Sequence, residues 1–407
     1  MKLIYPDFIL TPEGLLEQHA IAFEKTIVAI APLDEVRKQF PDAEYIKLPV
    51  GSLVMPGLIN THVHLEFSAN KTALHYGSFM PWLHSVIDQR ATLVGECSTE
   101  TMEKATQKML RSGTTTFATV SSNGLDLTAC EKAPQNVIFF NELIGSQAVM
   151  ADALFGDFKE RLAASDSVTR EGFQSAIAIH SPYSVHPILI EKAIQIAKSR
   201  NLPLSAHYLE SNAEREWLDN SEGEFKPFFK NLIGQDKAVN SAGEFLNLFD
   251  NHPTLMTHVI KANDNELQQL ADKGHTVIHC PISNRLLGNG AINLDALDNH
   301  NINWLCATDG LSSNYKLDLF EEMKIALFMH SETPLLPLAQ SLIESVTSRA
   351  AKALNLNKGS IEVGKDADML VLTLDEEPNE QLALHLLLHN YPIDSLFING
   401  KHHTLEH

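Results

Sequence analysis

The chain has 407 residues, 44% of them hydrophobic and 20% charged, which suits one α/β barrel with an appendage or two to three average domains. Asp and Glu outnumber Lys and Arg by 51 to 31, and the net charge of −20 disfavours binding to nucleic-acid phosphates or anionic lipid surfaces. No stretch reaches the roughly 18 apolar residues of a membrane span, and the four cysteines form no CxxC pair, so we expect a cytoplasmic protein with reduced thiols.

Residues 1–55 alternate short apolar runs with turns. Strands are predicted at 3–5, 8–10, 20–23 and 26–30. Residues 12–14 (Pro-Glu-Gly) supply a turn between the second and third of these runs. The first segment therefore predicts part of a small β domain.

Eight apolar runs, each followed by a helix-length segment, occupy residues 56–357. This rhythm is typical of parallel strands joined by crossover helices, as in a (β/α)8 barrel. The helical pattern at 191–200 supports that interpretation. The runs are 57–64, 114–120, 137–142, 176–180, 203–207, 255–258, 276–279 and 304–308.

Short strands return in residues 358–407. They are predicted at 360–363, 369–372 and 395–398, with a turn at 364–366. Together with residues 1–55 they are expected to form one β domain from both ends of the chain. Residues 405–407 resemble the start of an appended tag, and the histidines of this end are left out of the functional interpretation; they are His402, His403 and His407.

The first run of the predicted barrel ends in two histidines with one residue between them. Residues two apart on a strand share a face, so His62, His64 and Glu66 are predicted to point into the barrel mouth. Two imidazoles at this spacing can bind one divalent cation. An isolated His-x-His pair is usually an ordinary surface or core feature, and this pair gains weight from later strand ends.

Those later strand ends carry further polar groups, and the strand ends of a barrel converge on one face. His207 ends the fifth run, and Glu210, three residues on, suits an acid or base rather than a ligand. The sixth run ends in His258 and the eighth in Asp309, which can bind metal weakly and accept a proton from water. Three histidines and one aspartate with an open water position form a catalytic metal set.

Several motifs covering almost the whole chain resemble the amidohydrolase superfamily. The His-x-x-Glu of 207–210 and the TDGLSSN of 308–314 are similar to its cytosine, guanine and S-adenosylhomocysteine deaminase branch. Residues 64–83 and 279–290 resemble the aminodeoxyfutalosine deaminases of the futalosine route to menaquinone. The motifs are VMPGLINTHVH, HSPYSVH, AHYLE, THV, HCPISNRLLGNG, ATDGLSSN and GSIEVGKDADMLVL.

This resemblance implies a distorted barrel, a small β-sandwich from both termini and one divalent ion, Zn²⁺ or Fe²⁺. Related barrels with two metals often carry a lysine at the end of the fourth strand, and its absence beside His180 favours one metal. The ion would lower the pKa of a water molecule. The implied metal ligands are His62, His64, His207 and Asp309.

The resemblance also implies catalytic and substrate-binding roles. Glu210 would carry a proton to the ring nitrogen of a purine nucleoside, and His258 would orient or deprotonate the water. Glu66 would bind the substrate or support a ligand histidine. The remaining predicted substrate contacts are His180, Asn284 and Arg285. Arg285 would bind the carboxylate that aminodeoxyfutalosine carries at the end far from its purine ring.

Three alternatives stay open at this point. The enzyme could deaminate another aminopurine or a nucleoside like methylthioadenosine or S-adenosylhomocysteine, or it could be a triazine-type chlorohydrolase. A non-catalytic scaffold is the alternative from another class, and the intact ligand set argues against it. The expected partner is a small nucleoside, and self-association is left open.

Overall fold

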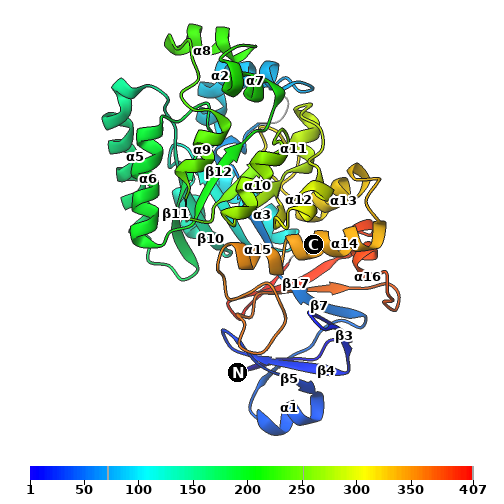
Figure 1. Cartoon of the computed structure of the whole chain (residues 1–407). Coiled ribbons are helices and arrows are strands. Elements are labelled where there is room, and N and C mark those ends of the chain that lie inside the picture. The colour runs from blue at the N-terminus through cyan, green and yellow to red at the C-terminus, as the bar shows by residue number, and fades with distance from the viewer. Residues whose placement is uncertain (71–72, 251, 406–407) are drawn as a thin grey trace.

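The computed structural model describes residues 1–70, 73–250 and 252–405. A helix-covered barrel stands above two smaller sheets that contain the N-terminus (Figure 1). Within the described residues, no helix combines the length and apolar character needed to cross a bilayer.

Eight parallel strands in chain order form the barrel, which confirms the predicted (β/α)8 fold. Most of their side chains are buried, as expected for strands with the barrel interior on one face and helices on the other. The strands are β8 (Leu58–Val63), β9 (Thr114–Ser121), β10 (Asn136–Leu143), β11 (Phe173–Ile179), β12 (Leu204–Tyr208), β13 (Leu255–His258), β14 (Thr276–His279) and β15 (Trp304–Cys306).

The first and last strands of the barrel meet along a seam of side-chain hydrogen bonds. The side-chain amide of Asn60 in β8 donates to the hydroxyl of Thr308 over 2.8 Å, and the backbone amide of Thr308 donates to Oδ1 of Asn60 over 3.3 Å. The backbone amide of Asp309 donates to the carbonyl of His62 over 3.1 Å. Asn60 and Thr308 are fully buried, so the seam closes the barrel away from water.

Amphipathic helices cover the outside of the barrel. In α3 (Thr99–Arg111), Ser98 caps the first turn by accepting from the amide of Thr101, and Met102, Ala105 and Met109 are buried at helical spacing. The other helices of this layer and its neighbours are α4 (Leu127–Lys132), α5 (Ala151–Asp166), α6 (Pro187–Arg200), α9 (Ala242–Leu248), α10 (Asp264–Asp272), α11 (Pro281–Leu286), α12 (Leu294–Asn299), α13 (Leu319–Met329), α14 (Leu335–Ser345), α15 (Ser348–Ala353) and α16 (Leu382–Leu388).

Three helices stand together at the top of Figure 1: α2 (Phe79–Glu96), α7 (Asn212–Asn220) and α8 (Phe225–Ile233). Aromatic contacts join them to each other and to the barrel. The rings of Phe79 and Phe225 lie 6.1 Å apart, and Phe225 also lies 4.7 Å from Tyr183. These helices therefore roof the carboxyl ends of the strands.

Both ends of the chain contribute to a six-stranded sheet in which β16 (Met369–Thr373) pairs antiparallel with β7 (Ser52–Pro56). A four-stranded sheet packs against it, and Phe23 meets Phe397 in the apolar layer between them. We retain the division into 1–55, 56–357 and 358–407 as a proposal. The remaining strands are β1 (Lys2–Ile4), β2 (Phe8–Thr11), β3 (Gly14–Glu17), β4 (His19–Phe23), β5 (Ile27–Pro32), β6 (Glu44–Ile46), β17 (Ile393–Ile398) and β18 (Lys401–Thr404).

The terminal regions depart from the sequence prediction in several places. Residues 360–363 are not a strand, because Ile361 is anchored in the apolar layer while Val363 stays exposed without a partner strand. The helix α1 (Leu33–Gln39) and the strands β3, β6 and β7 were not predicted. His402 and His403 belong to β18, and the ring of His402 stacks on Phe397 at 4.8 Å. Of the predicted tag residues, 406–407 lie outside the described residues.

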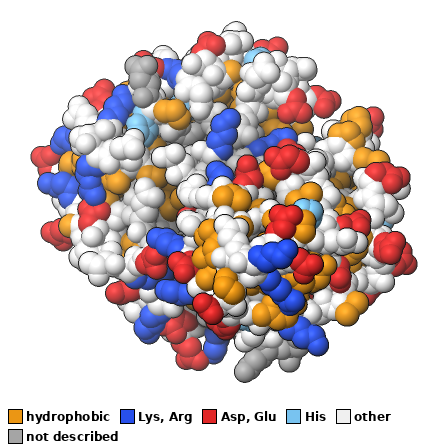
Figure 2. All heavy atoms as spheres, turned by 90° about the horizontal axis from the view of Figure 1, so that it is seen from below, with side chains coloured by type: hydrophobic (Ala, Val, Ile, Leu, Met, Phe, Trp, Pro, Cys, Tyr) orange, Lys and Arg blue, Asp and Glu red, His pale blue; other side chains and the backbone are white. Residues whose placement is uncertain are grey.

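The surface seen from below carries both signs of charge. Acidic and basic side chains alternate there among small hydrophobic groups (Figure 2). This face therefore presents mixed charge, in a chain whose net charge is −20.

Candidate active site

The end of β8 delivers two histidines to the barrel mouth. His62 is fully buried, and its Nε2 has no hydrogen-bond partner among the described residues. Its Nδ1 lies 3.4 Å from the hydroxyl of Thr257 on β13. Burial, reinforced by the neighbouring imidazoles, lowers the pKa of His62 well below its usual value, so the ring is neutral and its Nε2 lone pair is free for a ligand.

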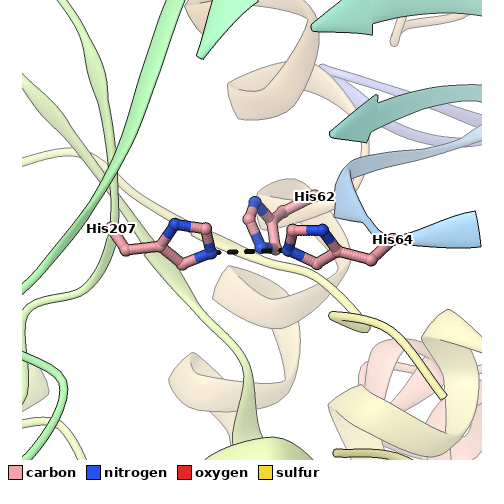
Figure 3. Close-up of side chains that lie close together, drawn as sticks. All are labelled: His62, His64 and His207. Carbon is pink, nitrogen blue, oxygen red and sulfur yellow. Dashed lines mark hydrogen bonds between the residues drawn. The ribbon is translucent and has the colours of Figure 1, made fainter. Parts of the chain in front are cut away.

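His207, at the end of β12, faces the β8 histidines across the mouth (Figure 3). Its Nδ1 donates to the carbonyl of His180 over 2.8 Å, which fixes the tautomer and leaves Nε2 as the lone-pair nitrogen. The Nε2 atoms of His207 and His64 lie 3.4 Å apart. Two nitrogens bound to one tetrahedral ion at 2.0–2.1 Å would be separated by about 3.3 Å. His62, His64 and His207 therefore fit a shared divalent cation.

Asp309 follows β15 and completes the group. Its Oδ1 lies 3.7 Å from Nε2 of both His62 and His64, and its Oδ2 accepts hydrogen bonds from Ser283 and Ser313 over 2.8 and 3.0 Å. Burial opposes ionisation, but the surrounding imidazoles outweigh it and hold the pKa of Asp309 below its usual range. The structure thus brings all four predicted ligands together.

Close backbone packing supports the position of Asp309. The next residue is Gly310, where a Cβ atom would lie 2.7 Å from the Cβ of His64 and 2.9 Å from its carbonyl oxygen. Asp309 itself has a φ of +57°, a conformation that costs energy for a residue with a side chain. The surrounding contacts therefore hold the carboxylate in a geometry that the isolated chain disfavours.

Glu210 lies beside the histidine group in a buried position. Its Oε1 accepts from the side-chain amide of Asn289 over 3.2 Å and lies 3.6 Å from Nε2 of His258. Burial, then repulsion from Asp309 and Glu214, raises the pKa of Glu210 well above its usual value. This shift favours the protonated carboxyl, which is the form that a general acid needs.

His258 occupies the end of β13 between Glu210 and Asp309. Its Nδ1 lies 3.0 Å from Oδ1 of Asn284, and its Nε2 lies 4.0 Å from Oδ2 of Asp309. Burial lowers its pKa to about 4, so the ring is neutral. With a φ of +74°, His258 is held in a backbone conformation that few residues with side chains adopt. A neutral imidazole in this place can accept a proton from water.

A cavity of about 460 Å³ opens above these groups. Its floor contains His64, His207, Glu210, His258 and Asp309, and helices α2 and α8 supply much of its wall. The apolar wall residues include Trp82, Leu83, Val86, Phe228 and Phe229. A larger hollow of about 890 Å³ near α3 is lined by none of the predicted site residues. The smaller cavity is therefore the candidate substrate site.

The predicted substrate contacts divide between the cavity and its surroundings. His180 lines the cavity, whereas Arg285 is exposed on α11 and is not among the lining residues. Asn284 is buried behind His258. Glu66 is also buried, and its carboxylate accepts from the backbone amides of residues 122, 123 and 125 at 3.0 Å each. Glu66 thus holds the loop after β9, which lies beside the cavity.

Two charged lining residues were not among the predicted site residues. Arg90 on α2 is the single Lys or Arg among the described lining residues, and its guanidinium donates to the Asn123 side chain over 3.3 Å. Glu142, at the end of β10, is buried, and one of its carboxylate oxygens has no hydrogen-bond partner in the part of the chain that the structure describes. The polar end of the β10 run pointed to Glu142, whereas nothing in the helical pattern marked Arg90.

Glu142, His180 and His207 form a second group with metal-ligand spacing. His207 is shared with the first group, but its Nδ1 already donates to the His180 carbonyl. A neutral imidazole offers one lone-pair nitrogen, and in His207 that nitrogen faces His64. The geometry therefore favours one ion, bound by the first group.

Comparison with known proteins extends the similarity over the whole chain. The profile of the amidohydrolase family matches residues 53–402. An aminodeoxyfutalosine deaminase of a Nitratiruptor species is 44% identical over 408 residues, covering 100% of both chains. An adenosine deaminase of Helicobacter pylori is 33% identical, with 95% of each chain aligned. The structure of Helicobacter pylori aminofutalosine deaminase with methylthio-coformycin superposes with a TM-score of 0.94 at 30% identity, covering 99% of this chain and 100% of that one.

Proposed function

Because this chain belongs to the amidohydrolase family, we propose that it is a hydrolase that releases the amino group of an adenine-type nucleoside as ammonia, and that its substrate is aminodeoxyfutalosine. In this reaction water replaces the amine on the purine ring, and the product carries an oxo group. The observation that carries the proposal is the buried group of Glu210, His258 and Asp309 beside three converging imidazoles. The full-length relative from Nitratiruptor supports the choice of substrate.

His62, His64, His207 and Asp309 would hold the metal, Zn²⁺ or Fe²⁺. The unpartnered Nε2 of His62 and the 3.4 Å approach of the His64 and His207 nitrogens fit such an ion. When bound, it would supply Lewis acidity, which brings the pKa of a water molecule near neutrality.

The other side chains would move the protons. The protonated carboxyl of Glu210 would donate to the ring nitrogen next to the attacked carbon, which removes the negative charge that develops there. His258 Nε2 and Asp309 Oδ2, 4.0 Å apart, would take the proton of the attacking water and pass it to the departing amine.

The test is ammonia release by the metal-loaded protein on a panel of aminopurine nucleosides. We expect the highest kcat/KM on aminodeoxyfutalosine. An outright preference for methylthioadenosine would replace the proposed substrate while keeping the deaminase activity. Chloride release from a triazine without deamination, or no hydrolysis of any kind, would overturn the proposal.

Location in the cytoplasm is part of the same proposal. All four cysteines are buried and free of disulfides, as expected where thiols stay reduced; they are Cys97, Cys130, Cys280 and Cys306.

We further propose that Arg90 supplies the countercharge for the distal carboxylate of the substrate. The cavity floor is rich in carboxylates, and Arg90 is the single Lys or Arg among the described residues that line it. Hydrogen bonds between charged groups contribute about 1.5–3 kcal/mol. Arg90→Met is therefore expected to raise KM for aminodeoxyfutalosine about 10- to 150-fold, with little change in KM for adenosine. Steady-state kinetics on both substrates measure the difference.

Arg285→Met is the matched control, because Arg285 is exposed on α11 outside the cavity. It should leave both KM values near those of the parent. If Arg285→Met gives the selective loss and Arg90→Met does not, the carboxylate lies on the α11 side and this assignment is wrong.

A further inference from the structure

A line of buried hydrogen bonds leads from His258 away from the cavity. His258 Nδ1 lies 3.0 Å from Oδ1 of Asn284, whose Nδ2 lies 3.2 Å from Nδ1 of His279. His279 Nε2 then lies 3.1 Å from Nε2 of His330, at the end of α13. Asn284 and His279 are fully buried, and His330 is 9% exposed. Three residues that do not line the cavity are thus connected to His258.

The amide of Asn284 gives this line a direction. Its oxygen faces His258, so it accepts the proton of His258 Nδ1, and its NH2 group donates to His279 Nδ1. His279 must then carry its proton on Nε2 and donate it to His330. Burial lowers the pKa of His279 well below its usual value, so the ring is neutral and has the single donor and single acceptor that this order requires.

We infer that Asn284, His279 and His330 are positioning residues that hold His258 in the tautomer with a free lone pair on Nε2. This inference rests on the proposed function, in which that lone pair accepts a proton from water. His258 Nε2 is the nitrogen that faces the cavity floor, 3.6 Å from Glu210 and 4.0 Å from Asp309. A proton on Nε2 would turn the same ring from a base into a donor.

Asn284 alone could not set this tautomer, because an amide turned by 180° has almost the same shape. The turned amide would donate to His258 Nδ1 and drive the imidazole proton to Nε2. His279 prevents the turn, since its Nδ1 accepts from the Asn284 NH2 group. His330 opposes the equivalent change in His279 when its own proton is on Nδ1, because its Nε2 then accepts the His279 proton. The proton position of each member is therefore coupled to that of the one before it.

The test compares two replacements of His330 in the metal-loaded enzyme. His330→Leu removes the acceptor for His279 and should lower kcat about 10- to 100-fold, as removal of an orienting partner behind an active-site imidazole does, with KM and metal content unchanged. His330→Gln keeps an accepting oxygen and should restore most of kcat. The control is His275→Leu, which removes another buried histidine, four residues before His279, whose ring accepts a hydrogen bond from the Thr254 amide.

A double substitution separates orientation from general loss of packing. In Asn284→Asp both side-chain oxygens accept, so turning the group no longer changes the His258 tautomer. Adding His330→Leu to Asn284→Asp should therefore lower kcat by a much smaller factor than His330→Leu does in the parent enzyme. The inference would be overturned if His330→Leu lowered kcat equally in the parent and in Asn284→Asp. It would also be overturned if His275→Leu lowered kcat as much as His330→Leu does.

Nitrogen NMR of histidine-labelled enzyme gives a readout that does not depend on turnover. The parent should show His258 protonated on Nδ1 and His279 on Nε2, and His330→Leu should reverse or mix both assignments. Unchanged tautomers in His330→Leu would overturn the positioning role even if kcat fell. A parent enzyme that shows these tautomers but deaminates no nucleoside would refute the proposed function instead.

Discussion

Replacing Glu210 with glutamine is expected to lower kcat by about 10²–10⁴-fold, the usual contribution of a general acid or base. The amide keeps the size of the carboxyl and can still meet Asn289, but it holds no transferable proton. Glu210 is not one of the converging ligands, so metal content should stay near that of the parent. Metal analysis and steady-state kinetics on the same preparation measure the two effects separately.

The pH dependence gives a second check on Glu210. Its pKa is raised in the folded protein, and the proposed role needs the protonated form, so kcat/KM of the parent should fall as pH rises through that pKa. Glu210→Gln should lose this alkaline decline along with most of its rate. The contrary result is a variant that binds less metal than the parent but has the parent's activity for each ion bound. In that case Glu210 belongs among the ligands.

Asp309→Asn is expected to reduce turnover by at least about 10³-fold, because a ligand and a proton acceptor are changed together. The amide could still weakly approach the ion, and its NH2 group would face the hydroxyls of Ser283 and Ser313, which now donate to the carboxylate. Thermal unfolding followed by circular dichroism should show the fold largely intact. Ammonia release under saturating substrate measures the loss.

Asp318→Asn is the matched control for this substitution. Asp318 is also buried in the same segment of the chain, but it caps α13 by accepting from the amides of Phe320 and Glu321. Asparagine caps helices about as well as aspartate, so this variant should retain its rate. Turnover of Asp309→Asn within tenfold of the parent would contradict the role assigned to Asp309.

The barrel was predictable from the sequence because its signals are local. Each strand is a short, mostly buried run, and the polar groups His62, His207, His258 and Asp309 lie within a few residues of the observed strand ends. Parallel strand ends must meet on one face of a barrel. That rule alone predicts that these four residues lie close together, although up to 247 positions separate them in the sequence.

The cavity wall was less predictable, because it depends on where helices cross the barrel mouth. Arg90 lies on α2, well after the strand end that carries His64, and its reach into the cavity is set by tertiary packing. Arg285 follows a strand end more closely, yet the turn of α11 points it to solvent. Helix periodicity alone does not distinguish these two arginines.

The terminal sheets were predicted in outline and missed in detail for a similar reason. Ile361 in the predicted strand 360–363 is buried, but none of the described strands pairs with this segment. His402 and His403 were set aside because of the tag-like residues that follow them, although β18 pairs with β17 in register. Pairing partners are nonlocal, and a single strand pattern does not reveal them.

The seam between β8 and β15 has a consequence for biosynthesis. Asn60 and Thr308 are 248 positions apart, so at a translation rate of 5–20 residues per second the first strand waits about 12–50 s for its partner. During that time β9 can cover only one edge of β8, and the other edge stays open to incorrect pairing. His62 and Asp309 meet across the same seam, so uptake of a metal ion would report that the last strand has arrived.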